Sequence, residues 1–133
     1  MGLSVMSDTK LDNTVNSSDF FRVIELIESY FAGLYFADSK RLKAIFHSDA
    51  YLKAPDQRRD LTTWLDDVES RAVPHELGLP YDFKILSIEI LQDQAMVKVD
   101  CPLFDHLYVD FLGLLKEQGN WKIVNKMYTD LRR

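Results

Sequence analysis

The stretch Gly119-Asn120-Trp121-Lys122-Ile123-Val124-Asn125-Lys126-Met127-Tyr128 decides the fold, because it has the form of a turn followed by a final strand. Three further strand-like stretches precede it, at residues 81–91, 95–103 and 107–116, and short polar turns separate them. Helical stretches precede these strands. Helices first and a meander of strands afterwards is an α+β pattern. The sequence therefore predicts one curved antiparallel sheet wrapped around helices, with a pocket between the two layers.

The first half of the chain has helical periodicity. Ser17, Ser18 and Asp19 are capping candidates, and a long helix is expected after them. Its buried stripe is predicted from apolar residues that recur at helical spacing: Phe20, Ile24, Ile27, Phe31 and Leu34. Glycine costs about 1 kcal/mol in a helix interior. Gly33 therefore indicates close packing against a neighbouring element.

Two shorter helices are expected next. Asp38 or Ser39 suits the N-cap of a second helix, and Asp60 suits that of a third. Between them, His47-Ser48-Asp49 has the composition of a turn, and a short strand is expected over residues 50–54. We expect residues 1–16 to form a flexible leader, because they are rich in Asp, Asn, Ser and Thr. Residues 17–133 are expected to form a single domain.

Composition excludes several classes of function. The chain has 133 residues and a net charge of -5, and it shows no basic face of the kind that nucleic-acid binders carry. No apolar segment is long enough to span a bilayer, and no secretory signal is visible. Cys101 is the only cysteine, so no internal disulfide is expected. We therefore predict a cytoplasmic protein with no metal, cofactor, nucleic-acid or membrane partner.

The last hairpin allows its faces to be predicted. A three-residue loop ending with Gly119 in the left-handed region would place Asp110 opposite Lys126. The odd-numbered face is the more apolar and is expected to pack against the helices: Val109, Phe111, Gly113, Leu115, Trp121, Ile123, Asn125 and Met127. Asn125 is the polar exception on this face. A buried amide needs hydrogen-bond partners, so Asn125 is a candidate ligand-binding residue.

The even-numbered face is expected to point away from the helices. It carries an apolar patch, and exposed patches of this kind usually mark an interface. A homodimer formed sheet to sheet would bury the predicted interface residues: Leu86, Ile88, Asp110, Leu112, Lys126 and Tyr128. The Asp110–Lys126 ion pair would then lie in or near the dimer contact. Lys126 would activate a carbonyl group if it were buried, although pairing with Asp110 is its simpler use.

Several motifs together resemble one known superfamily. Phe46-His47-Ser48-Asp49-Ala50, after a two-helix start, resembles the beginning of the first strand in the nuclear transport factor 2-like superfamily. Gly119-x-Trp121-Lys122-Ile123-Val124-Asn125-Lys126 resembles its last strand. Tyr30-x-x-Gly33 and Tyr108-x-Asp110 are most similar to the bacterial branch labelled putative lumazine-binding or polyketide-cyclase-like. The resemblance implies a cone-shaped α+β barrel, often dimeric, with the N-terminal helices packed in the concave face of a curved, mainly antiparallel sheet.

Catalytic members of this superfamily include ketosteroid isomerase, whose base is a carboxylate just before a proline at the end of the first strand. The matching position here is Ala54, before Pro55. An alanine side chain cannot abstract a proton, so the resemblance assigns no catalytic residue.

The favoured hypothesis is a small homodimeric domain that holds a small, partly apolar organic molecule in its cone. Apolar walls are expected from Tyr30, Tyr51, Trp64, Phe111 and Met127, and hydrogen bonds from Asn125 and His106. Two alternatives stay open. One is a lyase or isomerase of polyketide-like or aromatic substrates with a relocated acid or base. The other is a non-catalytic interaction module that uses the outer face of the sheet.

Overall fold

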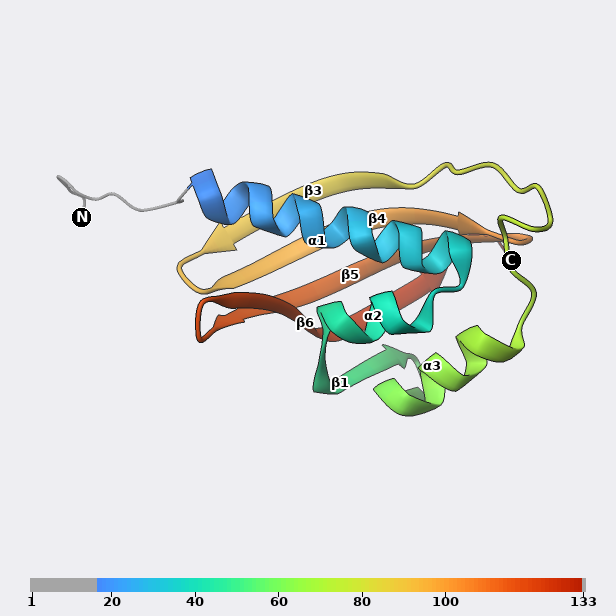
Figure 1. Cartoon of the computed structure of the whole chain (residues 1–133), viewed down its shortest axis with the longest axis horizontal. Helices are drawn as coiled ribbons and strands as arrows, with labels where there is room; N and C mark the ends of the chain where they lie inside the picture. Colours follow the sequence, from blue (N-terminus) through green and yellow to red (C-terminus); the bar gives the residue numbers. More distant parts are fainter. Residues whose placement is uncertain (1–16, 133) are drawn as a thin grey trace, which may run out of the picture.

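The computed structural model describes residues 17–132, so the predicted leader at 1–16 lies outside the described residues. Its elements are α1 (Ser17–Phe36), α2 (Ser39–Ile45), β1 (Phe46–Ala54), β2 (Gln57–Asp60), α3 (Leu61–Ser70), β3 (Lys84–Leu91), β4 (Gln94–Leu103), β5 (His106–Glu117) and β6 (Asn120–Asp130) (Figure 1). The strands form one sheet in the order β2-β1-β6-β5-β4-β3. All neighbouring strands are antiparallel except β1 and β6.

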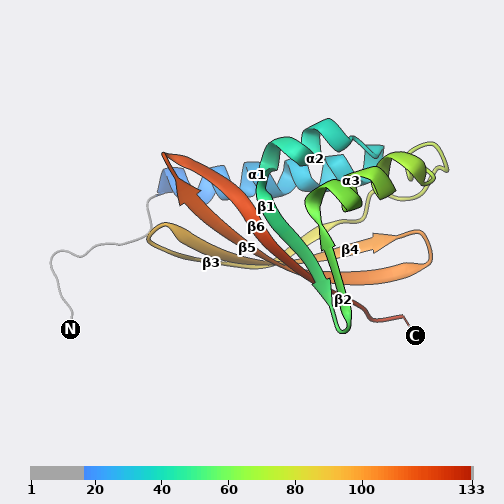
Figure 2. The same ribbon diagram turned by 90° about the horizontal axis from the view of Figure 1, so that it is seen from below.

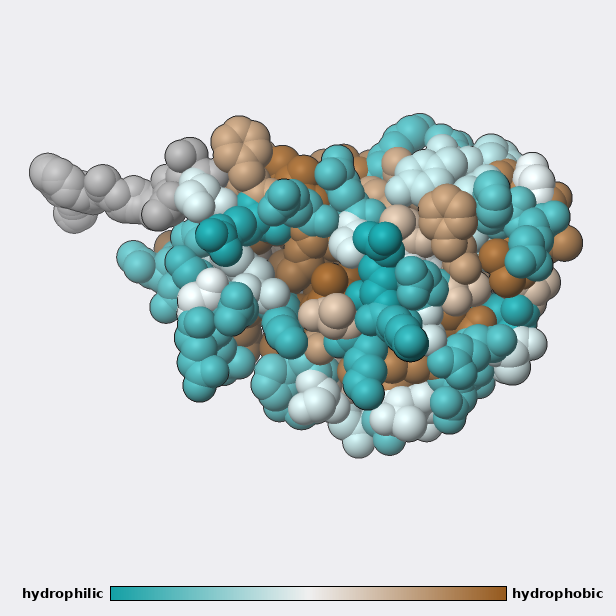
Figure 3. All heavy atoms as spheres, viewed as in Figure 1, coloured by the Kyte–Doolittle hydropathy of each residue, from teal (hydrophilic) through white to brown (hydrophobic). Residues whose placement is uncertain are grey.

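The sheet is curved, and the three helices cover one of its faces (Figure 2). The two edge strands, β2 and β3, do not pair, so the sheet stays open. The predicted α+β cone, with helices in the concave face, is confirmed. Seen from the helical side, the surface is largely hydrophilic, with hydrophobic atoms visible between the helices (Figure 3). Within residues 17–132, no helix combines the length and the apolar character needed to cross a membrane.

Helix α1 is the central element of the core. It buries Val23, Ile27, Tyr30 and Leu34 against the sheet. The predicted helical stripe is confirmed for Ile27, Phe31 and Leu34, which are buried, whereas Ile24 is only partly buried and Phe20 is 39% exposed. A Cβ atom on Gly33 would come within 2.5 Å of Leu42, a core residue of α2. This confirms that Gly33 permits a close approach of the two helices.

The short elements start at capped positions. Asp38 accepts a hydrogen bond from the Arg41 amide at 3.1 Å, and Asp60 accepts one from the Thr63 amide at 2.9 Å. Both predicted N-caps are therefore confirmed. Strand β1 begins at Phe46, so the turn predicted at residues 47–49 is wrong. Strand β2 was not predicted. Its sequence, Gln57-Arg58-Arg59-Asp60, has no apolar alternation, and it is a strand because a turn at Asp56 folds it back onto β1.

The last hairpin has a tighter turn than predicted. Glu117 pairs with Asn120, which leaves a two-residue loop of Gln118 and Gly119 with φ angles of 53° and 80°. The left-handed conformation of Gly119 is confirmed, and two consecutive positive φ angles are typical of a type I′ turn. The predicted three-residue loop and its strand register are wrong. Beyond the turn, β6 has one residue more than β5, because Leu114 pairs with Ile123 but Gly113 pairs with Asn125.

This bulge at Val124 reverses the faces of β6. Trp121 and Ile123 are buried before the bulge, and Lys126 is buried after it. In β5 the helix-facing side chains are the even-numbered ones, Asp110, Leu112 and Leu114. The predicted face of β5, and of the second half of β6, is therefore wrong.

The outer face of the sheet has an apolar patch of its own, which we call the outer patch: Tyr51, Met96, Phe111 and Met127. Each of these side chains is between 43% and 46% exposed. Phe111 of β5 pairs with Met127 of β6. Gly113 of β5 has no side chain and lies between Met96 of β4 and Asn125 of β6. Asn125 in turn pairs with Tyr51 of β1. The outer patch therefore crosses four neighbouring strands.

Candidate functional site

A small cavity of about 50 Å³ lies between α1, α3 and the concave face of the sheet. Its lining comes from six elements and from the residue that follows α3: Leu34, Arg59, Trp64, Arg71, Cys101, Leu103, Tyr108, Asp110, Lys126 and Tyr128. Large side chains fill the rest of the cone, among them Phe46, Leu52 and Leu112. The cavity volume is far below the roughly 300–1,000 Å³ of a typical ligand pocket, so it has room for a head group only.

Asp110 is the most deeply buried charged side chain of the cavity, with 1% of its surface exposed. The Tyr30 hydroxyl donates a hydrogen bond to Asp110 Oδ2 at 2.7 Å. The other oxygen, Oδ1, has no hydrogen-bond partner within residues 17–132. Burial raises the pKa of the Tyr30 hydroxyl well above its ordinary value, and the neighbouring carboxylate adds to this effect, so Tyr30 remains a donor. One oxygen of the Asp110 carboxylate, Oδ2, is thus held in place, while the other, Oδ1, can accept a hydrogen bond from a ligand.

Lys126 carries the only buried ammonium among the described lysines, with 8% of its surface exposed. Its Nζ atom lies 4.6 Å from the ring centre of Trp64, 5.3 Å from that of Tyr30 and 5.7 Å from that of Tyr128. Asp110 Oδ2 is 3.9 Å away, which is too long for a hydrogen bond. Burial lowers the pKa of Lys126; Asp110 acts against this effect, and the arginines of the cavity make smaller contributions in the same direction as burial.

Arg71 is a second cation with unmet hydrogen-bonding capacity. It caps the C-terminus of α3, where its backbone N–H donates to the Asp67 carbonyl. Its guanidinium lies over the ring of Phe104 at 5.8 Å. The Nε and Nη2 atoms are buried and have no acceptor in the described part of the chain. Burial is also the main reason that the pKa of Arg71 is lowered. An unpaired buried guanidinium favours an anionic oxygen as its partner.

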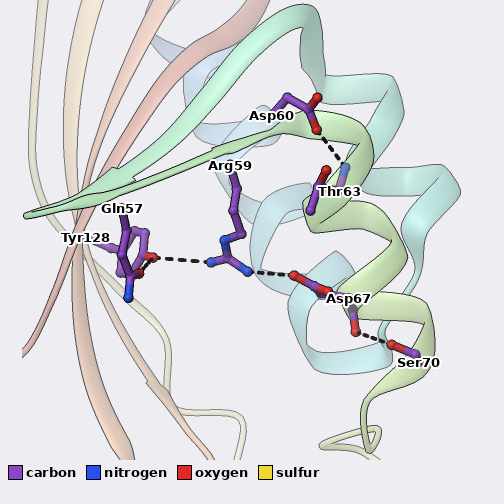
Figure 4. Close-up of polar contacts among 7 residues, drawn as sticks. All are labelled: Gln57, Arg59, Asp60, Thr63, Asp67, Ser70 and Tyr128. Carbon is purple, nitrogen blue, oxygen red and sulfur yellow. Dashed lines mark hydrogen bonds and ion pairs between the residues drawn. The ribbon is translucent and has the colours of Figure 1, made fainter.

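Arg59 and Tyr128 line the cavity and form a polar wall through the hydrogen bonds drawn in Figure 4. Arg59 donates to Asp67 at 2.9 Å and to the Tyr128 hydroxyl at 3.3 Å, and Tyr128 donates to Gln57 at 2.8 Å. These bonds join β2, α3 and β6. Outside this wall, a groove of about 920 Å³ runs over the β1–β2 turn and the end of β6. Arg59, Tyr108 and Tyr128 line both the groove and the cavity.

Cys101 and His106 are poorly suited to act as a nucleophile or as an acid or base in the cavity. Burial raises the pKa of the Cys101 thiol, so it stays protonated and is a poor nucleophile. His106 lies at the start of β5, where its Nδ1 is 2.7 Å from Asp130 Oδ2 and its ring stacks on Tyr108. Its side chain is 46% exposed and contacts the rim rather than the cavity.

Because β5 and the second half of β6 turn the opposite face to the helices, most residues predicted for the pocket and most predicted for the interface change places. Of the predicted pocket residues, Trp64 lines the cavity, and Tyr30 lies buried behind it, in contact with Asp110 and Lys126. Four other predicted pocket residues lie on the outer face instead: Tyr51, Phe111, Asn125 and Met127. Most predicted interface residues point toward the helices: Ile88, Asp110, Leu112, Lys126 and Tyr128. Leu86, which is 49% exposed, stays at the surface.

Arg59, Arg71 and Tyr108 were missed by sequence reasoning. Arg71 directly follows α3, one helical turn after the buried Val68, and a cation at that spacing from a buried residue is the signal that could have pointed to it. Arg59 had no such signal, because β2 itself was not recognised. Tyr108 belongs to the helix-facing set of β5 and was misplaced with the rest of that set.

An open, curved sheet with helices in its concave face and a polar cavity beneath them defines a member of the nuclear transport factor 2-like superfamily. Within it, the chain belongs to the family described as "Putative lumazine-binding", whose model matches residues 18–129. The chain is 25% identical over 118 residues to "Aldolase FrzH" from Cladobotryum sp, an alignment that covers 86% of this chain and 93% of that protein.

Solved structures show the same fold. An NTF2-like protein of unknown function from Shewanella baltica has a TM-score of 0.79 at 23% identity, covering 91% of this chain and all of that one. One from Silicibacter pomeroyi has a TM-score of 0.71 at 21% identity, covering 88% and 99%. The superfamily and branch expected from the sequence are therefore confirmed.

Proposed function

We propose that the cavity binds the oxygen-bearing head group of a small organic molecule, while the rest of that molecule lies in the adjoining groove. The observation that carries this proposal is Arg71, whose buried Nε and Nη2 atoms lack an acceptor within the described residues. Leaving a buried charged donor unpaired costs several kcal/mol, and a bound carboxylate or enolate oxygen removes that cost. The membership of a family named for binding a heterocycle supports a small-molecule ligand.

The dimensions of the site support the same division of the ligand. A cavity of about 50 Å³ holds a few non-hydrogen atoms, whereas the groove of about 920 Å³ has room for a ring system or an acyl chain. Tyr108 and Tyr128 offer aromatic surface where the two spaces meet. The ligand is therefore expected to be amphipathic, with its polar end innermost.

Thermal shift with matched acids and neutral esters tests this proposal. Aromatic carboxylic acids are expected to raise the melting temperature, and their methyl esters are not. Arg71→Met should abolish the difference, whereas Arg22→Met, at an exposed position of α1, should leave it intact. If acids and esters stabilise the protein equally, or if neither does at any concentration, recognition of an anionic head group by Arg71 is wrong.

A second candidate function is a lyase or isomerase with a relocated base. Ala54 lacks a carboxylate, but Asp110 supplies one from β5, next to Lys126 and Tyr30 inside the cone. The similarity to a protein named an aldolase supports carbon–carbon bond chemistry of this kind. The test is deuterium uptake from D₂O at the carbon beside a carbonyl, followed by NMR. Asp110→Asn should stop the uptake, and exchange at the same rate in that variant would argue against the enzyme.

A homodimer formed through the outer patch completes the proposal. The prediction of a sheet-to-sheet dimer is kept, but its central residues become Tyr51, Met96, Phe111 and Met127, because these large apolar side chains form one exposed patch across neighbouring strands. Sedimentation velocity tests it, with Phe111→Lys expected to give a monomer. A wild-type monomer would instead favour the alternative of an interaction module with a different partner.

The cytoplasm is kept as the proposed compartment. Cys101 is a free, buried thiol, which is compatible with a reducing environment. A fluorescent fusion of the full chain, fractionated from cells, is the direct test, and its recovery with secreted proteins would contradict this address.

A further inference from the structure

We propose that Lys126 forms a covalent imine with the carbonyl group of a small oxo acid that enters the cavity. This inference rests on the proposed function, because it uses the same cavity and the same innermost position for the polar end of the ligand. It adds a bond, a nucleophile and a substrate class: carbonyl compounds that also carry a carboxylate, of which the 2-oxo acids are the smallest.

The Lys126 amine lies at the cavity. The bulge at Val124 turns the second half of β6 over, so Lys126 points into the cone instead of toward solvent. Its Nζ atom lines the cavity and is enclosed by Trp64, Tyr30 and Tyr128. Every other lysine of residues 17–132 is exposed or partly exposed. A carbonyl carbon placed in the cavity therefore meets a single amine.

The Lys126 amine is surrounded by charged side chains of the cavity. Asp110 stands 3.9 Å away and does not form a hydrogen bond with it, while Arg59 and Arg71 line the same small cavity. Burial is the main effect that disfavours the ammonium form; Asp110 opposes it, Arg71 and Arg59 add to it, and on balance the pKa of Lys126 is lowered. A lysine amine in a desolvated pocket or beside another cation is the kind that forms Schiff bases.

Asp110 is close enough to Lys126 to accept a proton from its ammonium group and to return it later in the reaction. The ammonium of Lys126 gives one proton to Asp110, and the neutral amine uses its lone pair to form the bond to the carbonyl carbon. The carbonyl oxygen takes a proton from the nitrogen and becomes the hydroxyl of a carbinolamine. Asp110 returns its proton to that hydroxyl, which leaves as water while the nitrogen lone pair forms the C=N bond. The ammonium and the carbonyl compound thus become an iminium ion and water, and Asp110 ends as a carboxylate.

Tyr30 and Arg71 have supporting roles in this step. The Tyr30 hydroxyl fixes Asp110 Oδ2 at 2.7 Å, so Tyr30 is a positioning residue. Arg71 offers Nε and Nη2, two donors on one planar group, which suit the two oxygens of a carboxylate. Because an oxo acid has its carboxylate beside or near its carbonyl, binding by Arg71 would direct the carbonyl toward the interior of the same cavity.

Reductive trapping tests the imine on the full chain. The protein is incubated with pyruvate and sodium cyanoborohydride, and peptide mass spectrometry locates the carboxyethyl group. Lys126 is expected to be labelled at least about tenfold faster than Lys122, because Arg71 would hold the carbonyl group beside Lys126 in the same cavity. Lys122 is a matched control on the same strand, outside the cavity. Acetaldehyde, which has no carboxylate, should lose this selectivity, and Asp110→Asn should slow labelling of Lys126 specifically.

The outcomes separate this inference from the function on which it rests. Melting temperatures are recorded with pyruvate alone, for the wild type and for Lys126→Arg, which keeps the charge but not the nucleophile. Stabilisation by pyruvate together with equal labelling of Lys126 and Lys122 would overturn the imine and leave binding intact. No selective labelling of Lys126 would overturn the imine whether or not pyruvate stabilises the protein, and the series of aromatic acids and esters decides the proposed binding function separately. Because the wild-type map itself locates the label, this result stands even if the arginine variant fails to fold.

Discussion

The buried pair of Asp110 and Lys126 leads to a quantitative prediction about stability. Lys126→Met removes one charge and keeps much of the side-chain volume. It leaves Asp110, with 1% of its surface exposed, as a buried carboxylate that has lost its ion-pair partner and keeps the neutral donors Tyr30 and Cys101. Breaking a buried ion pair on one side costs about 3–5 kcal/mol. For a chain of this length that corresponds to a fall in melting temperature of roughly 10–18 °C.

The double variant Asp110→Asn/Lys126→Met isolates the interaction. It removes both charges, and the asparagine carbonyl can still accept the hydrogen bond from Tyr30. Buried ion pairs can often be replaced by neutral residues at little cost. We therefore expect the double variant to lie within about 1–2 kcal/mol of the wild type, far above the sum of the two single variants.

Urea unfolding followed by circular dichroism and tryptophan fluorescence measures these free energies. Lys122→Met is the control, because a partly exposed lysine on the same strand should change stability by no more than about 0.5 kcal/mol. A cost below about 1 kcal/mol for Lys126→Met would mean that water reaches Asp110 freely. Additive single variants would mean that the two charges do not interact. Either result would refute the description of the pair as a buried, coupled unit.

Three further predictions concern the rest of the fold. Gly33→Ala should cost about 1–3 kcal/mol in urea unfolding, because its Cβ would lie 2.5 Å from Leu42, and the double variant with Leu42→Ala should cost less than the sum of the two single variants. Asp19 accepts hydrogen bonds from Lys116 and an indole N–H, which lower its pKa below the ordinary 3.8, so its contribution is present above that pH and lost as pH falls. The stability gap between wild type and Asp19→Asn, measured by urea titration, should therefore narrow below pH 4, and a constant gap would contradict the shift. Gln118→Asn should raise the melting temperature by stabilising the type I′ turn by a few tenths of a kcal/mol, and a decrease would argue against that turn type.

Much of the fold could be predicted from the sequence because several signals agreed. Helical spacing, the caps at Asp38 and Asp60, and the permissive Gly33 are local features, and the structure confirms each of them. The left-handed Gly119 is likewise a local requirement of a tight turn. What failed depended on tertiary contacts. Strand β2 has a polar sequence and forms only because β1 offers it an antiparallel neighbour.

The faces of β5 could not be decided by polarity. Both faces carry large apolar residues, with Leu112 and Leu114 on one and Val109 and Phe111 on the other. The odd-numbered face was chosen because it is the more apolar of the two, and this choice placed Asp110 and Lys126 on the wrong side. The bulge at Val124 then hid the error in β6, because Trp121 and Ile123 do face the helices as predicted. A shift of one residue moves every following side chain to the other face.

The failure of the polarity rule at Asp110 and Lys126 is itself informative about function. Burying two charges 3.9 Å apart, without a hydrogen bond between them, is a poor way to stabilise a small domain. An apolar pair would pack the cone at lower cost, as the leucines of the same strand do. Natural sequences depart from such rules mainly at functional sites. The same cavity contains Arg71 with two unpaired donors in the described chain, so three costly charges meet around one small space. Stability does not explain this arrangement, whereas recognition and activation of an anionic carbonyl compound requires charges of this kind at this place.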